Sequence, residues 1–144
     1  MKLIAIDTAA NLCAACVFDA RAAIVTGESV RDIGKGHAEQ LMDVIDAAMA
    51  AAGIAYGDLD RIAVTVGPGS FTGVRVGVSA ARGLALALSV PAVGVNTLEA
   101  LAAGERTLRP DKDVLAVIDA GRGTVYAVRP RTDADAGRQD QPPD

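Results

Sequence analysis

The chain has 144 residues, of which 51% are hydrophobic and 22% charged, with a formal net charge of −4. Its Lys and Arg residues are scattered and only 3% of residues are aromatic, which argues against a basic nucleic-acid surface or an aromatic stacking platform. The longest apolar stretch, residues 84–95, is too short to span a bilayer, and no signal peptide precedes the first strand, so we expect a cytoplasmic protein without a membrane segment.

The first predicted elements are three strands. Residues 3–7 form a short apolar run that ends in a carboxylate, and residues 13–18 form a second run after a polar turn. These two runs predict a hairpin, and residues 22–26 predict a third strand, so an antiparallel meander precedes any helix. A plain dinucleotide-binding fold would instead cross over after its first strand.

Cys13 and Cys16 have the C-x-x-C spacing of metal or redox sites. The sequence has two cysteines in all, whereas a tetrahedral zinc site needs four ligands. In a strand, residues three apart point to opposite faces, so both side chains are expected to be structural thiols.

Helices and strands are expected to alternate after the meander. Apolar residues recur at helical spacing over 37–52, with Gly53 placed as a C-terminal cap. Strands are predicted over 62–66 and 92–95, separated by a helix over 72–88 and followed by a short helix over 97–102.

A second lobe is predicted to begin near the end of the chain. Residues 105–112 are polar and contain a proline, which is typical of a crossing segment. Residues 114–119 repeat the opening pattern of an apolar strand that ends in Asp, and residues 125–128 predict its antiparallel partner. The predicted division is therefore a first lobe over 1–103, a linker and hairpin over 104–129, and a polar, disordered tail over 130–144.

The most informative segment is residues 67–77, with four glycines, a proline and two hydroxyl residues between a strand and a helix. One interpretation is an anion cradle at the helix start. The other is close packing, because Gly73, Gly77 and Ala81 are spaced by four and form one smooth stripe. We favour packing, and a Walker-type site is excluded because no Gly-Lys-Ser/Thr sequence follows.

Four motifs together resemble the bacterial TsaB (YeaZ) family: residues 6–8, 36–39, 67–77 and 116–123. Two lobes that each open with a strand ending in Asp are also the pattern of the actin, hexokinase and Hsp70 superfamily. The resemblance covers residues 1 to about 129 and implies an α/β, actin-like ATPase (ribonuclease H-like) lobe. That lobe would have a mixed five-stranded sheet with helices, plus the start of a similar second lobe.

Family membership implies a non-catalytic partner of TsaD in tRNA threonylcarbamoyladenosine modification. TsaD and TsaE homologues are the expected partners, a homodimer is a further one, and tRNA would be contacted only indirectly. No metal site and no firm cofactor are expected, although ATP or ADP with Mg is considered at the level of the complex. The vestigial nucleotide-binding residues implied by the superfamily are Asp7, Thr8, Gly67, Gly69, Ser70, Asp119 and Gly121.

Docking is expected to use the two long helices, which carry more apolar residues than one sheet face can hide. Arg75 and Arg82 lie on one helical face and could form ion pairs across an interface or project into solvent. The predicted interface comprises Leu41, Ile45, Met49, Gly73, Arg75, Gly77, Ala81 and Arg82.

Three alternatives stay open or are disfavoured. An ATP-dependent phosphotransferase or ATPase of the same superfamily would need a general base and an adenosine pocket, neither of which is identifiable. A glycoprotease-like metalloenzyme is disfavoured because His37 is the single histidine and H-E-x-x-H needs two. An inactive, truncated product is the third alternative, since most of the second lobe is missing relative to the family.

Overall fold

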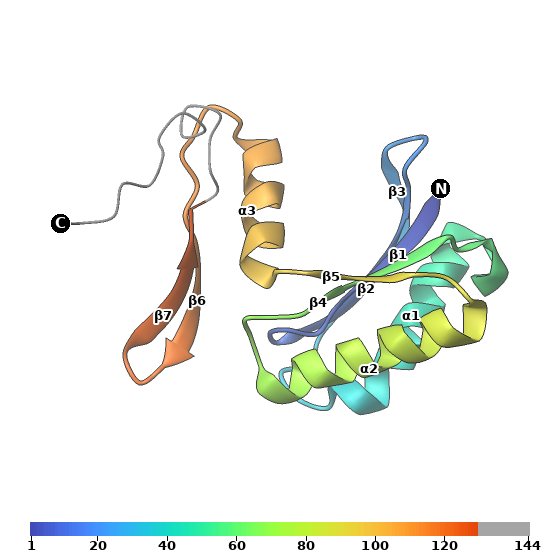
Figure 1. Ribbon diagram of the computed structural model, residues 1–144, viewed down its shortest axis with the longest axis horizontal. Helices are drawn as coiled ribbons and strands as arrows, with labels where there is room; N and C mark the ends of the chain where they lie inside the picture. Colours follow the sequence, from blue (N-terminus) through green and yellow to red (C-terminus); the bar gives the residue numbers. More distant parts are fainter. Residues whose placement is uncertain (130–144) are drawn as a thin grey trace. The chain divides into compact units, whose positions relative to one another are not determined.

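The structure is a computed structural model that describes residues 1–129, and it divides the chain into two units, which meet between Thr97 and Leu98 (Figure 1). The predicted boundary after residue 103 lies further along, inside the helix that follows. The predicted disordered tail, residues 130–144, lies outside the described residues.

Unit 1, residues 1–97, contains a mixed five-stranded sheet in the order β3-β2-β1-β4-β5. The first three strands, β1 (Lys2–Asp7), β2 (Leu12–Asp19) and β3 (Ile24–Asp32), pair as an antiparallel meander. β4 (Arg61–Thr65) and β5 (Ala92–Val95) add to β1 in parallel. The predicted fold class, an α/β lobe with an antiparallel opening meander and a mixed five-stranded sheet, is confirmed.

Two helices, α1 (His37–Ala52) and α2 (Phe71–Leu88), lie on the same face of this sheet (Figure 1). α1 packs on β2 and β3, and α2 packs on β1 and β4. α1 ends where predicted, because Gly53 adopts the left-handed conformation (φ 65°) and donates to carbonyls of the last turn. A 3₁₀ turn, η1 (Tyr56–Asp58), connects α1 to β4.

The core of unit 1 lies between the helices and the sheet. Alternate residues of β1, β2 and β4 face α1 and α2, as the two-residue period of a strand requires. Cys13 belongs to this buried face, whereas Cys16 is half-buried on the opposite one, which confirms the predicted division of the two thiols. The large side chains in this core are Ile4, Ile6, Val17, Leu41, Val44, Ile45, Met49, Ile62 and Val64.

Two elements are longer than predicted. β3 was expected over 22–26 but begins at Ile24 and continues to Asp32, since its polar residues pair along the full length of β2 at the exposed edge of the sheet. The last helix was expected over 97–102, but α3 spans Thr97–Leu108. Residues 105–108, predicted as a linker, are therefore helical, and Glu105 pairs with Arg109 one turn later.

Unit 2, from Leu98 onward, contains the rest of α3 and a hairpin formed by β6 (Ala116–Gly121) and β7 (Thr124–Val128). The hairpin confirms the predicted strand, turn and strand, displaced by one or two residues. Its small core consists of Leu98, Ala102 and Ala116, with partly buried Val114, Ile118 and Val128 packed against them.

α2 is long and apolar enough to meet the minimal length and composition of a membrane-spanning helix. Three of its small residues, Gly73, Gly77 and Ala81, are buried within unit 1, and two arginines are exposed on its outer face. This distribution is typical of an amphipathic helix that covers a sheet.

Candidate functional site

The glycine-rich loop packs tightly on the turn between β1 and β2. A Cβ atom on Gly69 would lie 2.2 Å from the carbonyl oxygen of Ala9, and one on Gly73 would lie 2.1 Å from that of Thr8. A Cβ on Gly77 would lie 2.4 Å from the Thr8 hydroxyl. Only glycine fits at these three positions without moving the turn, so the packing interpretation of the loop is supported.

Ser70 ends the loop and caps α2. Its Oγ accepts a hydrogen bond of 3.2 Å from the Gly73 amide, and its own amide donates to the Ala9 carbonyl at 2.6 Å. A Ser side chain at this position satisfies one of the free amides of the first helical turn. The Ser70 hydroxyl and amide are thus both used inside unit 1.

Asp7 and Thr8 are held by the same packing. Thr8 is fully buried and its hydroxyl donates to the Gly73 carbonyl at 2.7 Å. One carboxylate oxygen of Asp7, Oδ1, accepts from the Thr65 hydroxyl at 2.8 Å and from the Ala9 amide at 3.0 Å. The side chains therefore fix the β1–β2 turn against β4 and α2.

The predicted nucleotide-binding residues are consequently engaged within the fold. The Thr8 hydroxyl and the Ser70 amide donate to carbonyls of unit 1, and Gly69 packs against Ala9. Gly67 has φ +103° and its carbonyl accepts from the Thr97 amide at 2.9 Å. In unit 2, Asp119 accepts from the Gly121 amide at 2.7 Å, which closes the β6–β7 turn. Mg-nucleotide binding stays a prediction.

Most of the predicted interface residues are buried in the core of unit 1. They belong to the apolar stripe of each helix, and that stripe packs on the chain's own sheet. Arg75 and Arg82 are both exposed, Arg75 in the groove described next and Arg82 outside it. The correction concerns Leu41, Ile45, Met49, Gly73, Gly77 and Ala81, which have no surface to offer a partner, apart from the edge of Leu41 in the groove described next.

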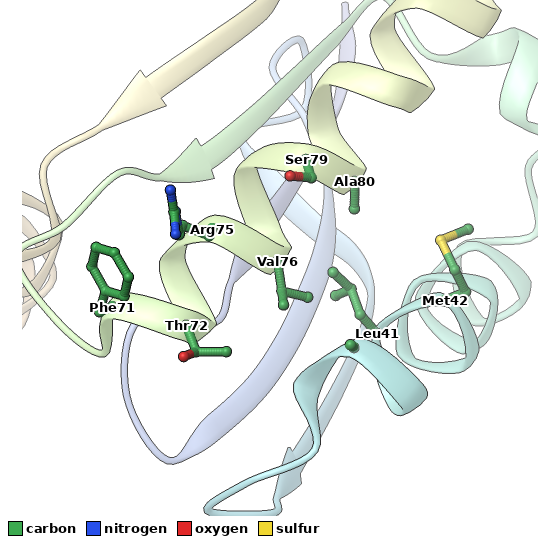
Figure 2. Close-up of a pocket in the computed structure, with 9 residues that line it drawn as sticks. Leu41, Met42, Phe71, Thr72, Arg75, Val76, Ser79 and Ala80 are labelled. Carbon is green, nitrogen blue, oxygen red and sulfur yellow. The ribbon is translucent and has the colours of Figure 1, made fainter.

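A groove of about 450 Å³ runs between α1 and α2 and is open to solvent (Figure 2). Phe71 is 73% exposed at one end, and Met42, on the side of α1, is 45% exposed. Neither was predicted as a docking residue, because helical periodicity alone does not show which residues line the crevice between two helices. The groove is lined by Ala38, Leu41, Met42, Phe71, Thr72, Arg75, Val76, Ser79 and Ala80.

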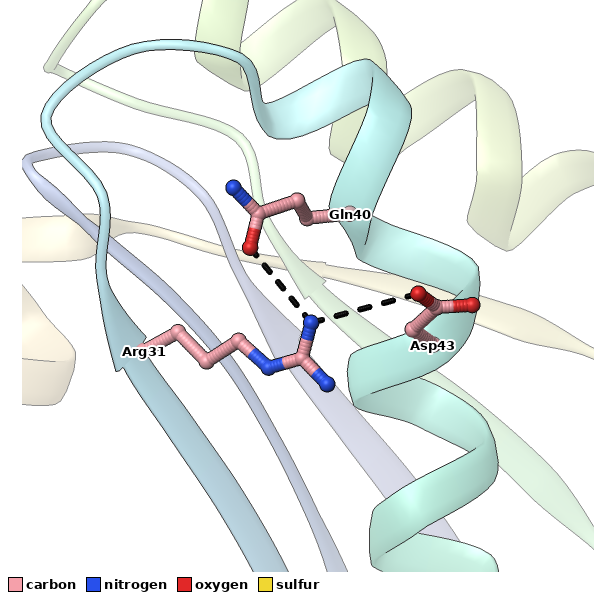
Figure 3. Close-up of polar contacts among 3 residues, drawn as sticks. All are labelled: Arg31, Gln40 and Asp43. Carbon is pink, nitrogen blue, oxygen red and sulfur yellow. Dashed lines mark hydrogen bonds and ion pairs between the residues drawn. The ribbon is translucent and has the colours of Figure 1, made fainter.

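The charged side chains of α1 and α2 have different partners. The guanidinium group of Arg75 lies over the Phe71 ring, 4.5 Å from its centroid. On α1, Asp43 contacts Arg31 of β3 at 4.0 Å, and the same guanidinium nitrogen donates to Gln40 at 3.4 Å (Figure 3). The exposed carboxylates of α1 are thus directed to β3, and Arg75 stands in the groove.

Tyr56, the two cysteines and His37 are held within unit 1 by burial or hydrogen bonds. Tyr56 donates to Asp46, and burial together with that carboxylate raises the pKa of the Tyr56 hydroxyl. Burial also raises the pKa values of the Cys13 and Cys16 thiols, so both are protonated at neutral pH. His37 is buried at the start of α1 with Nε2 3.1 Å from the Leu12 carbonyl. Residues 1–129 contain no group of three or more potential metal ligands.

Comparison with known proteins places this fold. Residues 31–140 match the family model described as "TsaD: tRNA N6-adenosine threonylcarbamoyltransferase". The chain is 34% identical over 126 residues to the tRNA threonylcarbamoyladenosine biosynthesis protein TsaB of Escherichia coli, covering 88% of this chain and 53% of that protein. It is 36% identical over 126 residues to TsaB of Bacillus subtilis, with the same coverage of 88% and 53%.

Solved structures agree with the sequence relatives. An uncharacterized protein from Pseudomonas aeruginosa with similarity to peptidase YEAZ superposes with a TM-score of 0.80 at 30% identity, covering 90% of this chain and 60% of that one. YeaZ from the same organism gives a TM-score of 0.78. The predicted actin-like lobe is thereby confirmed, and the chain spans about half the length of the curated relatives that it matches.

Proposed function

Because the chain belongs to the TsaB/YeaZ family, we propose that it is an accessory subunit in the formation of tRNA threonylcarbamoyladenosine, docking on a TsaD-like transferase through the exposed face of α1 and α2. Its relatives in Escherichia coli and Bacillus subtilis carry the name of that biosynthetic pathway. In this proposal the chain is non-catalytic, tRNA is reached only through the complex, and a TsaE homologue or a second copy is a further partner.

The groove between α1 and α2 is the observation that carries this proposal. It presents Phe71 and Met42, which are large apolar side chains with 73% and 45% of their surface exposed. Exposed apolar residues gathered in a crevice between two helices favour a protein-binding site. Two of the residues expected to bind nucleotide, Thr8 and Ser70, form hydrogen bonds within unit 1 through their hydroxyl groups, which favours an assembly role over phosphoryl transfer.

The direct test is binding of the chain to the TsaD homologue of the same organism, measured by isothermal titration calorimetry and light scattering. Met42→Arg places a charge in the groove and is expected to weaken binding by at least about tenfold, as for a central interface residue. Ala50→Arg is the matched control, since residue 50 is also exposed on α1 but does not line the groove. Equal affinity of the two variants and the unchanged chain would contradict the proposed docking face.

A further inference from the structure

The groove contains a single ionisable side chain. Its lining is apolar or hydroxylic apart from Arg75, which projects from α2 near the Phe71 ring (Figure 2). Burying an unpaired guanidinium against a wholly apolar partner is unfavourable, because the charge loses water without gaining an opposite charge. Arg75 therefore restricts the chemistry of whatever covers the groove.

Arg75 is held in place without an anionic partner. Its guanidinium stacks on the Phe71 ring at 4.5 Å, and none of the ion pairs among residues 1–129 includes it. Stacking on an aromatic ring orients the planar group and leaves the N–H donors at its edge free for a carboxylate. The arrangement is suited to a bidentate contact with an incoming Asp or Glu.

Two of the three carboxylates of α1 have partners elsewhere in unit 1, and the third, that of Glu39, lines the neighbouring pocket with Thr72. Asp43 contacts Arg31 on β3, as Figure 3 shows, and Asp46 accepts from Tyr56. Among the ion pairs of residues 1–129, none joins Arg75 to Glu39, Asp43 or Asp46, so the first helix does not neutralise this charge. A carboxylate of the partner can pair with the Arg75 guanidinium, because opposite charges face each other across complementary interfaces.

We infer that the groove receives an acidic amphipathic helix of the partner, whose apolar side chain enters between Met42 and Val76 and whose carboxylate pairs with Arg75. This inference rests on the docking face proposed above and adds the chemistry of the occupant. A helix fits because the crevice lies between two helices, into which the ridge of a third can pack. Arg75 is then a specificity-determining residue, and Phe71 is the residue that positions it.

The experiment measures affinity for the purified TsaD homologue as a function of salt concentration. Arg75→Gln is expected to weaken binding about tenfold at low salt, as for a partly desolvated charge pair. It should also flatten the salt dependence, because the pair screened by salt is gone. Arg82→Gln is the matched control: it removes the same charge from an exposed position on the same helix outside the groove, so affinity should change less than about twofold.

The outcomes separate this inference from the proposed function. If Met42→Arg abolishes binding while Arg75→Gln and Arg82→Gln have equal, small effects, the docking face stands and the acidic occupant is refuted. If Met42→Arg is without effect, both fail together. If the groove instead holds a second copy, shown by a dimer that Met42→Arg disperses and Arg75→Gln does not, the inference is also overturned. Circular dichroism of each variant checks that the substitution leaves the fold intact, as expected for an exposed residue such as Arg75.

Discussion

Substitution of Gly77 by Ala tests the packing of α2 on the β1–β2 turn. The added Cβ would lie 2.4 Å from the Thr8 hydroxyl and 3.4 Å from a methyl carbon of Val64. Thr8 cannot rotate away easily, because it is fully buried and its hydroxyl is bonded to the Gly73 carbonyl. Either α2 must move outward or the Thr8 hydrogen bond must break.

Three contributions determine how much the free energy of unfolding should fall in the Gly77→Ala variant. Overpacking a well-packed core costs about 2 kcal/mol. Breaking or distorting the buried Thr8 hydrogen bond costs about 1 kcal/mol. Replacing Gly by Ala inside a helix returns about 1 kcal/mol through helix propensity. The free energy of unfolding should therefore fall by about 2 kcal/mol.

Urea unfolding followed by circular dichroism at the helix band measures this change. Gly83→Ala is the matched control, because Gly83 lies in the same helix and a Cβ there meets nothing within 4 Å, so that variant should gain up to about 1 kcal/mol. Thr8→Ala combined with Gly77→Ala should cost less than the sum of the two single changes, since the clashing oxygen is gone. A Gly77→Ala variant as stable as the unchanged chain would refute the reasoning.

Three further predictions concern unit 1, the first with a control position, Gly104, in unit 2. Gly27→Ala should destabilise by about 2 kcal/mol, since its Cβ would lie 2.3 Å from the α1 backbone, whereas Gly104→Ala, with nothing within 4 Å, should not; equal unfolding midpoints would contradict this. Asp7→Ala should cost about 1–3 kcal/mol in the same urea titration, because two donors lose their acceptor. Burial raises the thiol pKa values of Cys13 and Cys16 in the folded state. Their contribution to the free energy of unfolding should therefore be fully present below about pH 9 and fall at higher pH. A variant with both Cys13→Ala and Cys16→Ala whose free energy of unfolding falls equally steeply with pH would disprove that cause.

The sequence predicts the elements whose local pattern agrees with their environment. The helix over residues 37–52 has both a buried apolar stripe and Gly53 at its end, so its bounds were correct. β3 was shortened in prediction because its second half is polar, and only pairing with β2 makes it a strand. The last turn of α3, up to Leu108, is polar and resembles a linker in composition. Its charged residue Glu105 pairs with Arg109 one turn later, at the spacing of a helix.

The burial of most predicted docking residues could not be read from the sequence, for a physical reason. Helical periodicity identifies an apolar stripe but does not state which surface covers it. Leu41, Ile45 and Met49 satisfy the pattern expected of a docking face, yet the sheet of the same chain buries them. Phe71 is the first residue of α2 and gave no periodic signal. Its exposure follows from the direction in which α2 leaves the glycine-rich loop.

The hydrogen bond between Thr8 and Gly73 joins residues 65 positions apart, and it has a consequence for synthesis on the ribosome. The opening hairpin cannot obtain its final support until more than half of the chain has left the exit tunnel, because α2 supplies that support. Contacts so distant along the polypeptide slow the search for the native state. Nascent chains that pause before α2 emerges would thus expose the apolar side of β1, which α2 covers in the folded protein, and this is the interval in which a chaperone has most to protect.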